Sequence, residues 1–268
     1  MQSLDKERVE TVFAMFKGEP GTRKSTQALS FPTPQYWFPT DGKMNALVLP
    51  AKYWGVSLAD VHYDKYTDYN SVIKKLNEFQ LKCPYKTLVI DSITSMADVI
   101  NRQTIKLKSG TTTKDGAEKG IRVGGIPVNS LEDYKAEASA FQELIAVCKD
   151  IQVFHKINII LIAHVIGDRP VSAGDQTHFA RIIITGGKTI SGKIPAYCDE
   201  TYHFNVEADI NADMPGKYGC LTVHTGADFA RTALPLERKI IFGDKPLYAG
   251  WIKPAMDKLN AQQVLTKL

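Results

Sequence analysis

Cysteine is scarce in this sequence, and its few copies lie far apart. The four cysteines form no C-x-x-C pair, so the usual spacing of a zinc site or a disulfide framework is missing. We therefore expect free, buried thiols at Cys83, Cys148, Cys198 and Cys220. Metal-ligand spacing is also missing among His62, His155, His178, His203 and His224.

Long apolar runs are missing as well. No run approaches the roughly 18–20 residues that cross a bilayer, and the charged start MQSLDKERVETVF lacks the apolar centre of a signal peptide. We therefore expect a cytoplasmic protein without a membrane partner. The 268 residues, 44% of them apolar and 23% charged, have the balance of a globular protein. Neither a repeat nor a boundary is visible, so we expect one domain over 1–268, with a core at about 10–245 and an extension at 246–268.

Short apolar runs alternate with helical patterns along the chain. We predict extended segments at 10–17, 36–42, 45–50, 86–96 and 157–165. We predict helices from residue 24 onward, at 68–82 with Asp68 or Asn70 as the N-cap, and at 131–150. This alternation predicts an α/β fold with a mostly parallel central sheet flanked by helices.

The remaining segments are expected to be loops and added strands. Residues 102–130 and 166–193 fit neither pattern, and loops of that length are usually functional or disordered. Three runs within 200–252, ETYHFNVEA, GCLTVHTGA and RKIIFG, are expected to add C-terminal antiparallel strands to the sheet.

The stretch FKGEPGTRKSTQALSFP, residues 16–32, nearly matches a phosphate-binding loop. The spacing G-x-x-x-x-G-K-[ST] fits Gly18, Lys24 and Ser25, whereas Arg23 stands where the second glycine belongs. In such a loop, backbone N–H groups hold phosphate oxygens, the lysine reaches the β- and γ-phosphates, and the hydroxyl binds Mg²⁺. The predicted nucleotide-binding residues are Gly18, Glu19, Pro20, Gly21, Thr22, Arg23, Lys24, Ser25 and Thr26.

Arg23 is the unusual residue of this loop. An arginine fits there only with regular backbone angles, because a strained conformation costs on the order of 1–3 kcal/mol. We expect its side chain either to point away from the phosphates or to lie over them as an added cation. A chance lysine-containing turn before a helix is the other interpretation.

A second half-site supports the nucleotide interpretation. In TLVIDS, a buried strand ends on Asp91, as a Walker B strand does when it delivers a carboxylate to Mg²⁺. The two motifs together predict a P-loop NTPase that uses ATP and Mg²⁺, with Ser25 and Asp91 as the metal-binding pair.

Two further stretches extend the pattern to a known family. The strand ends in WFPTDG and INIILIAHV, taken with the order of motifs, resemble the RecA/RadA-like ATPases over roughly residues 10–245. The resemblance implies a RecA-like P-loop NTPase core. It also implies that Asp41 polarises the attacking water and that His164 reports the γ-phosphate state, so the expected catalytic residues are Lys24, Asp41, Asp91 and His164. Asp41 is shorter than the usual glutamate. It also fits a plain turn, and His164 also fits a core histidine.

The family members that the chain resembles most are small phage-encoded RecA-like ATPases of single-strand annealing and recombination. In RecA-like filaments the two loops after the Walker B and sensor strands hold single-stranded DNA, and here those loops are 102–130 and 166–193. Residues 101–130 carry a net charge of +4, equal to that of the whole chain. The DNA-binding candidates are Lys106, Lys108, Lys114, Lys119, Arg122, Arg169, Phe179 and Arg181. A solvated charge run is the alternative.

The resemblance also implies a homo-oligomer, either ring or filament, whose ATP sites lie between subunits. The candidates for a cation acting on a neighbour's γ-phosphate are Lys188, Lys193 and Arg231. We expect an ATPase that assembles on single-stranded DNA in the cytoplasm, of a host cell if phage-encoded. The alternative is a nucleotide-binding regulatory protein with weak hydrolysis and no DNA role. A small-molecule kinase fits less well, because a lid with arginines is not evident.

Overall fold

The computed structural model describes residues 8–109, 121–123, 126–128, 130–170, 179–186, 188–207, 216–226 and 228–265. The strands are β1 (Phe13–Gly18), β2 (Gln35–Pro39), β3 (Val61–Tyr63), β4 (Thr87–Asp91), β5 (Ile121–Val123), β6 (Ile126–Val128), β7 (Asn158–Pro170), β8 (Phe179–Ile183), β9 (Glu200–Glu207), β10 (Lys217–Leu221) and β11 (Lys239–Ile241). The helices are α1 (Lys24–Ala28), α2 (Val48–Trp54), α3 (Tyr69–Leu81), α4 (Ile93–Ser109), α5 (Leu131–His155), α6 (Lys188–Tyr197) and α7 (Lys253–Leu265). Three short helical segments are η2 (Met44–Leu47), η3 (Leu58–Asp60) and η4 (Tyr248–Ile252).

In the described part of the chain, nine strands form one central sheet. Eight of them follow the order β11-β10-β9-β1-β7-β4-β2-β3, and β8 pairs with β7 beside this row. The six strands from β9 to β3 run parallel, whereas β10, β11 and β8 are antiparallel to their neighbours. The predicted mostly parallel sheet with C-terminal antiparallel strands is confirmed.

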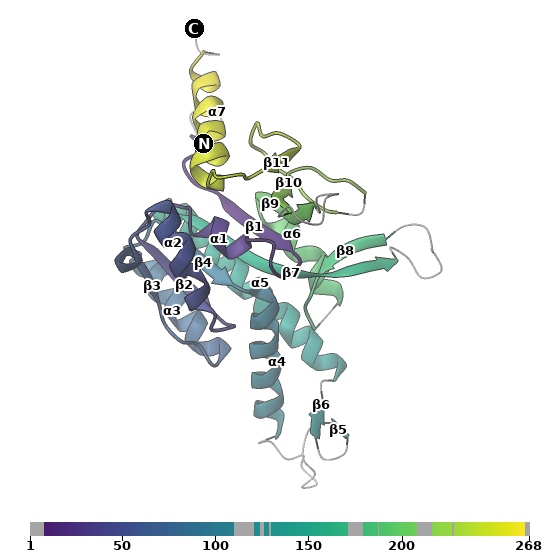
Figure 1. Cartoon of the computed structure of the whole chain (residues 1–268). Coiled ribbons are helices and arrows are strands. Elements are labelled where there is room, and N and C mark those ends of the chain that lie inside the picture. Colours follow the sequence, from purple (N-terminus) through teal and green to yellow (C-terminus); the bar gives the residue numbers. More distant parts are fainter. Residues whose placement is uncertain are drawn as a thin grey trace.

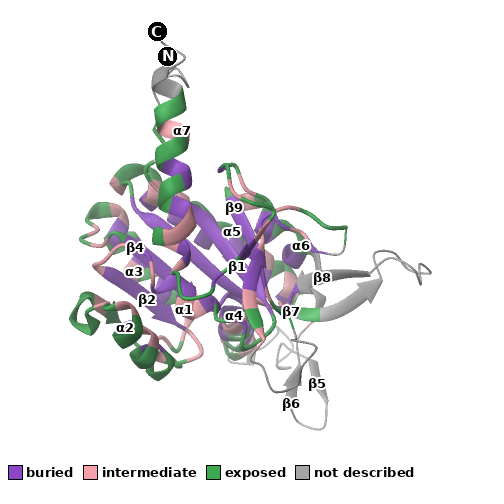
Figure 2. Ribbon diagram, turned by 45° about the horizontal axis from the view of Figure 1, so that its top comes forward, coloured by how far each residue is buried: buried purple, intermediate pink, exposed green. Residues whose placement is uncertain are grey.

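Side chains of the buried strands feed a hydrophobic layer on each face of the sheet. Phe13 and Met15 of β1 pack with α3, α4, α5 and α6, whereas Ala14 and Phe16 pack with α1, α2 and α7. This division follows from the two-residue repeat of a strand. Figure 1 shows the helices on both sides of the sheet, and Figure 2 shows that the central strands are buried along most of their length.

The helix predicted at 68–82 is confirmed as α3. The Asp68 side chain accepts a hydrogen bond from the Ser71 N–H at 2.9 Å, which makes Asp68 and not Asn70 the N-cap. Val72, Leu76 and Phe79 are buried on one side of this helix. The local pattern therefore contained enough information to place this element.

The prediction of an extended segment at 45–50 is wrong, because these residues form η2 and the start of α2. Leu47 and Ala51 are buried four residues apart, whereas Leu49 is 75% exposed, and this is helical spacing. Pro50 lies in the first turn of α2, where the N–H that proline lacks would have no intrahelical partner. A short apolar run does not by itself distinguish a strand from a helix.

The two predicted long loops are partly regular structure. Helix α4 continues to Ser109 and β5 pairs with β6, so part of 102–130 is a helix and a hairpin. Strand β7 continues to Pro170, β8 returns antiparallel to it, and α6 begins at Lys188, so part of 166–193 is also ordered. Figure 1 shows α4 and the start of α5 leaving the body together, and β7 with β8 leaving it as a second arm.

The first of the three C-terminal runs does not form the expected antiparallel strand. Strand β9 pairs parallel with β1, because α6 carries the chain back across the sheet before β9 begins. Only β10 and β11 have the predicted antiparallel direction.

All four cysteines are free, and Cys148, Cys198 and Cys220 are buried as predicted, whereas Cys83 is half-buried. Among the described residues, no helix is both long and apolar enough to cross a membrane.

Candidate nucleotide site

The predicted catalytic residues gather at the carboxyl edge of the parallel strands. Lys24 opens α1 just after β1, Asp91 ends β4, and Asp41 follows β2. The strand registers align these positions, since Gly18 pairs with His164 and Pro39 pairs with Asp91. Ligands of open α/β sheets bind at this edge.

The loop between β1 and α1 has the backbone form of an anion nest. Gly21 has a φ of 81° and Arg23 a φ of 64°, and the helical conformation begins at Lys24. Such alternation of left- and right-handed residues turns successive N–H groups into one concavity. At Gly18 the backbone lies so close to β9 that only glycine fits, because a Cβ there would lie 2.4 Å from the Phe204 carbonyl oxygen.

Lys24 lies inside this loop and is only 4% exposed. Its ammonium donates hydrogen bonds to the carbonyl oxygens of Gly18 at 2.9 Å and Glu19 at 2.7 Å, and to the Thr22 hydroxyl at 3.2 Å. Burial lowers the pKa of Lys24 to about 8, although the nearby charges of Asp91 and Glu19 act in the opposite direction. The Lys24 ammonium is therefore largely removed from water and is held by oxygen atoms of the loop.

Arg23 adopts the left-handed backbone conformation, with φ 64° and ψ 24°. The expectation of regular backbone angles is wrong, and the conformation costs on the order of 1–3 kcal/mol for a residue with a Cβ. Its guanidinium carbon lies 3.8 Å from the centre of the Tyr218 ring on β10. The side chain thus stacks on an aromatic ring, a contact that contributes about 0.5–1 kcal/mol at an exposed site.

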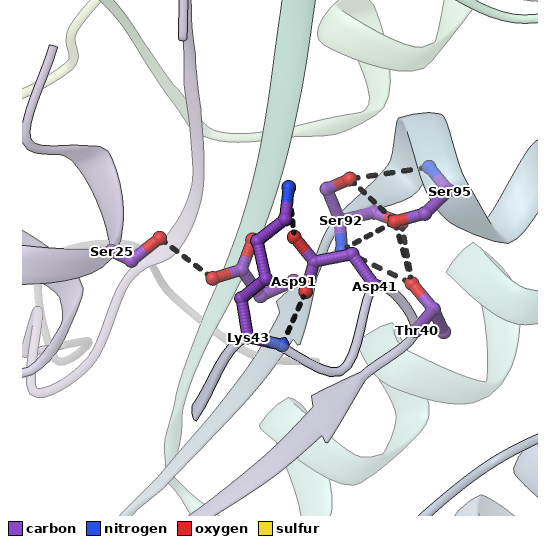
Figure 3. Close-up of polar contacts among 7 residues, drawn as sticks. All are labelled: Ser25, Thr40, Asp41, Lys43, Asp91, Ser92 and Ser95. Carbon is purple, nitrogen blue, oxygen red and sulfur yellow. Dashed lines mark hydrogen bonds and ion pairs between the residues drawn. The ribbon is translucent and has the colours of Figure 1, made fainter. Parts of the chain in front are cut away.

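Ser25 and Asp91 form a hydroxyl–carboxylate pair at the start of α1. The Ser25 hydroxyl donates to Asp91 Oδ2 at 2.6 Å, as Figure 3 shows. Burial raises the pKa of Asp91 to about 6, whereas the hydrogen bond from Ser25 acts to lower it. A hydroxyl and a carboxylate side by side are hard oxygen groups of the kind that would hold Mg²⁺, which takes few protein ligands and completes its shell with water and phosphate oxygens.

Asp41 lies beside Asp91 in the same close-up (Figure 3). Its carboxylate accepts the Lys43 N–H at 3.1 Å and lies 3.4 Å from the Lys43 ammonium. The Thr40 N–H donates to the Asp91 carbonyl oxygen at 2.9 Å, which ties the two strand ends together. The turn interpretation of Asp41 and its place at the carboxyl edge therefore hold at the same time.

His164 lies where β7 leaves the parallel sheet. The strand does not end there as predicted, because β7 continues to Pro170 in its pairing with β8. The His164 N–H donates to the Thr94 hydroxyl at 3.0 Å, and its carbonyl oxygen accepts the Ile184 N–H at 2.9 Å. Its buried Nδ1 has no hydrogen-bond partner among the described residues. Burial, followed by the charges of Lys24 and Lys43, lowers the pKa of His164, so the ring is neutral at neutral pH.

The DNA-binding candidates lie mainly on the two arms. Lys106 and Lys108 belong to α4, Arg122 to β5, Arg169 to β7, and Phe179 and Arg181 to β8. Lys114 and Lys119 lie outside the described residues. The Lys108 ammonium forms an ion pair with Asp133 at 2.6 Å and so connects α4 to the start of α5.

The candidates for a cation acting on a neighbour belong to α6 and to the segment that pairs with β9. Lys188 and Lys193 belong to α6. Arg231 is exposed, and its backbone pairs with Thr201 of β9.

Two structural contacts near the site were not foreseen from the sequence. Glu137, fully buried in α5, accepts hydrogen bonds from the Asn101 side chain at 3.2 Å and from the Gly186 N–H at 2.9 Å. It joins α4, which follows Asp91, to the segment that follows β8. Tyr218 is the second, and no local signal connects it with Arg23, since the two residues are brought together only by β10.

A phosphate-type loop, a buried lysine and a hydroxyl–carboxylate pair at the edge of a parallel sheet define a P-loop ATPase of the RecA-like class. A family model described as "AAA domain" (AAA_24) matches residues 12–233, and the chain belongs to this family. The family and the fold that the sequence motifs predicted are thereby confirmed.

A solved structure agrees on the fold. The crystal structure of the RadB recombinase superimposes with a TM-score of 0.50 at 15% identity, covering 88% of this chain and 89% of that chain. A KaiC-like protein from the hyperthermophilic archaeon Pyrococcus horikoshii OT3 gives a TM-score of 0.45 at 11% identity, with coverage of 86% and 88%. No curated protein matches the chain. At such low identity, the likeness to RadB concerns the fold alone.

Proposed function

We propose that this protein binds and hydrolyses ATP and assembles on single-stranded DNA as a homo-oligomer. The observation that carries the proposal is the 2.6 Å contact between Ser25 and Asp91, next to the buried ammonium of Lys24. A hydroxyl, a carboxylate and a cation in this arrangement are the groups that bind a nucleoside triphosphate with its Mg²⁺.

Each residue has a distinct role in the proposal. The backbone N–H groups of residues 18–26, except Pro20, which has none, hold phosphate oxygens, and Lys24 exchanges its contacts with Gly18 and Glu19 for the β- and γ-phosphates. Ser25 and Asp91 would hold Mg²⁺, which when bound neutralises charge on the phosphates. Asp41 orients the attacking water, since it lies beside Asp91 at the same strand edge.

His164 connects the site to the β7–β8 arm. Its ring contributes a buried nitrogen near Lys24 that has no hydrogen-bond partner in the described part of the chain, and its carbonyl oxygen accepts the Ile184 N–H just after β8. A shift of β7 when the γ-phosphate is lost would therefore move the arm that carries Arg169 and Phe179. This is how ATP hydrolysis would alter contacts with DNA.

The basic arms are the proposed DNA surface. Arginines and lysines on them would neutralise phosphates, and Phe179 would stack on a base. Lys108 would first have to exchange Asp133 for a phosphate. Lys188, Lys193 and Arg231 remain the candidates for a cation donated to a neighbouring subunit, and the kinship with annealing ATPases rests on the sequence motifs.

A nucleotide-dependent regulatory protein is the second candidate. One feature in its favour is that the proposed catalytic carboxylate of Asp41 already pairs with the Lys43 ammonium. The other is that Arg23 replaces the glycine of the loop motif. This protein would bind ATP but turn it over slowly, and DNA would have no effect on turnover.

Single-stranded DNA is expected to stimulate ATP hydrolysis several-fold. The affinity for DNA should fall steeply with salt, because phosphate contacts release counterions. Steady-state ATPase assays with and without a single-stranded oligonucleotide check this, together with binding measured over a salt series. Arg169→Ala and Phe179→Ala should weaken the stimulation, whereas Lys82→Ala, an exposed lysine after α3, should not. ATP binding without stimulation, and without salt-dependent DNA binding, would favour the regulatory protein.

The pH dependence of kcat/KM for ATP is expected to be bell-shaped. The Lys24 ammonium loses its proton above its pKa of about 8, and Asp91 becomes protonated below its pKa of about 6. Activity should therefore fall on both sides of that window. A profile that is flat through pH 6 and pH 8 would contradict these roles for Lys24 and Asp91.

A further inference from the structure

Arg23 occupies a backbone conformation that glycine adopts freely and arginine does not. Its left-handed φ of 64° is part of the alternation that turns the loop's N–H groups inward. With an arginine there, other loop conformations compete with the nest. A contact outside the loop must stabilise the nest conformation if the loop is to be preorganised for phosphate binding.

Arg23 makes a contact outside the loop with Tyr218 of β10. The Arg23 guanidinium lies 3.8 Å from the ring centre, within the range of a cation–π contact. The backbone that carries the ring is fixed, since Tyr218 pairs with Val206 of β9 and its carbonyl oxygen accepts the Phe242 N–H at 2.9 Å, and the side chain is partly buried against the hydrophobic layer that contains Phe16. A sheet residue fixed on both sides thus provides a rigid platform for a loop side chain.

Helix α1 is anchored separately from the loop. The Gln27 side-chain oxygen accepts the Leu247 N–H at 2.7 Å, and the Ser30 hydroxyl accepts the Tyr248 N–H at 3.3 Å. Loss of the Tyr218 ring would therefore leave α1 in place and release only Arg23. This separation allows the effect of the stack on the loop to be measured by itself.

We propose that Tyr218 is a positioning residue for ATP, which holds Arg23 so that the loop keeps its nest conformation. This inference rests on the proposed function, because it concerns the same nucleotide site. The ring touches no phosphate and acts through Arg23. Apparent affinity then depends on the fraction of molecules whose loop is already in the binding conformation.

The test is a cycle of variants, with ATP affinity measured by calorimetry. Tyr218→Leu keeps an apolar side chain but removes the ring, and it should weaken ATP binding about threefold to fivefold, as expected for an exposed cation–π contact. Tyr218→Phe keeps the ring and should bind like the parent. Arg23→Gly restores the residue that the loop motif prefers, so Tyr218→Leu in that background should change affinity less than twofold.

The controls separate this role from general damage. Tyr63→Leu makes the same change on β3, at the other end of the sheet, and should leave affinity unchanged. Thermal unfolding of each variant shows whether the sheet is intact. The role of Tyr218 would be overturned, while the ATP site stands, if Tyr218→Leu left ATP affinity unchanged in the parent protein. It would also be overturned if Tyr218→Leu weakened ATP binding equally in the parent and in the Arg23→Gly variant. A parent that binds no ATP would overturn the proposed function and this inference together.

Discussion

Replacing Lys24 with alanine is expected to lower ATP turnover by about 10²–10³-fold, the usual effect of removing one charge-stabilising group from a site. Lys24 is 4% exposed, and its ammonium already bonds to carbonyl oxygens inside the loop. In such a place a charge interacts strongly with phosphate, because little water screens it. Steady-state kinetics should show the loss mainly in kcat if the lysine acts on the transition state.

The control for Lys24→Ala is Lys52→Ala, which removes an exposed lysine from α2. Its turnover should stay close to that of the parent. Because Lys24 also bonds to Gly18 and Glu19, thermal unfolding must show that the alanine variant is folded. A folded variant whose turnover stays within tenfold of the parent would mean that hydrolysis does not occur at this loop.

Replacing Gly18 with alanine is expected to lower the free energy of unfolding by about 3 kcal/mol, the upper part of the range for an added carbon in a packed site. The new Cβ would lie 2.4 Å from the Phe204 carbonyl oxygen and 3.1 Å from its carbonyl carbon. These are backbone atoms of the paired strand β9, so relief requires β1 and β9 to separate. For a chain of this size, the loss corresponds to a fall in Tm of roughly 6–12 °C.

Gly21→Ala is the matched comparison in the same loop. Gly21 has a φ of 81°, but none of the described atoms lies within 4 Å of its added Cβ. The expected loss is only the backbone strain, about 1 kcal/mol. Urea unfolding of both variants checks the difference, and equal losses would show that the close approach of β9 does not limit residue 18.

The sequence predicted those elements whose signals are local. Asp68 caps α3 and the buried positions of α3 recur at helical spacing, so that helix could be placed from its own residues. The apolar run that ends on Asp91 is strand β4, and the phosphate-loop spacing placed Lys24 and Ser25 at the start of α1. The RecA-like fold followed from the order of these motifs.

Prediction failed where neighbours in space decide the conformation. Residues 45–50 are apolar enough for a strand but form helix, because Leu47 and Ala51 pack into the hydrophobic layer that also contains Phe16 and α7. Strand β9 is parallel because it inserts beside β1, a pairing that its own residues do not specify. The end of β7 was misplaced because β8, the next strand along the chain, returns beside it and extends its pairing.

By itself, the sequence determined the class of this protein, since a phosphate loop and a strand-end aspartate are fixed by spacing and apolar pattern. Only the tertiary structure decided how these parts meet. The 2.6 Å contact of Ser25 with Asp91 and the stack of Arg23 on Tyr218 join residues from separate strands and loops. The left-handed angles of Arg23 contradict its local preference, and its side chain stacks on a ring that β10 brings to the loop from a distant part of the chain.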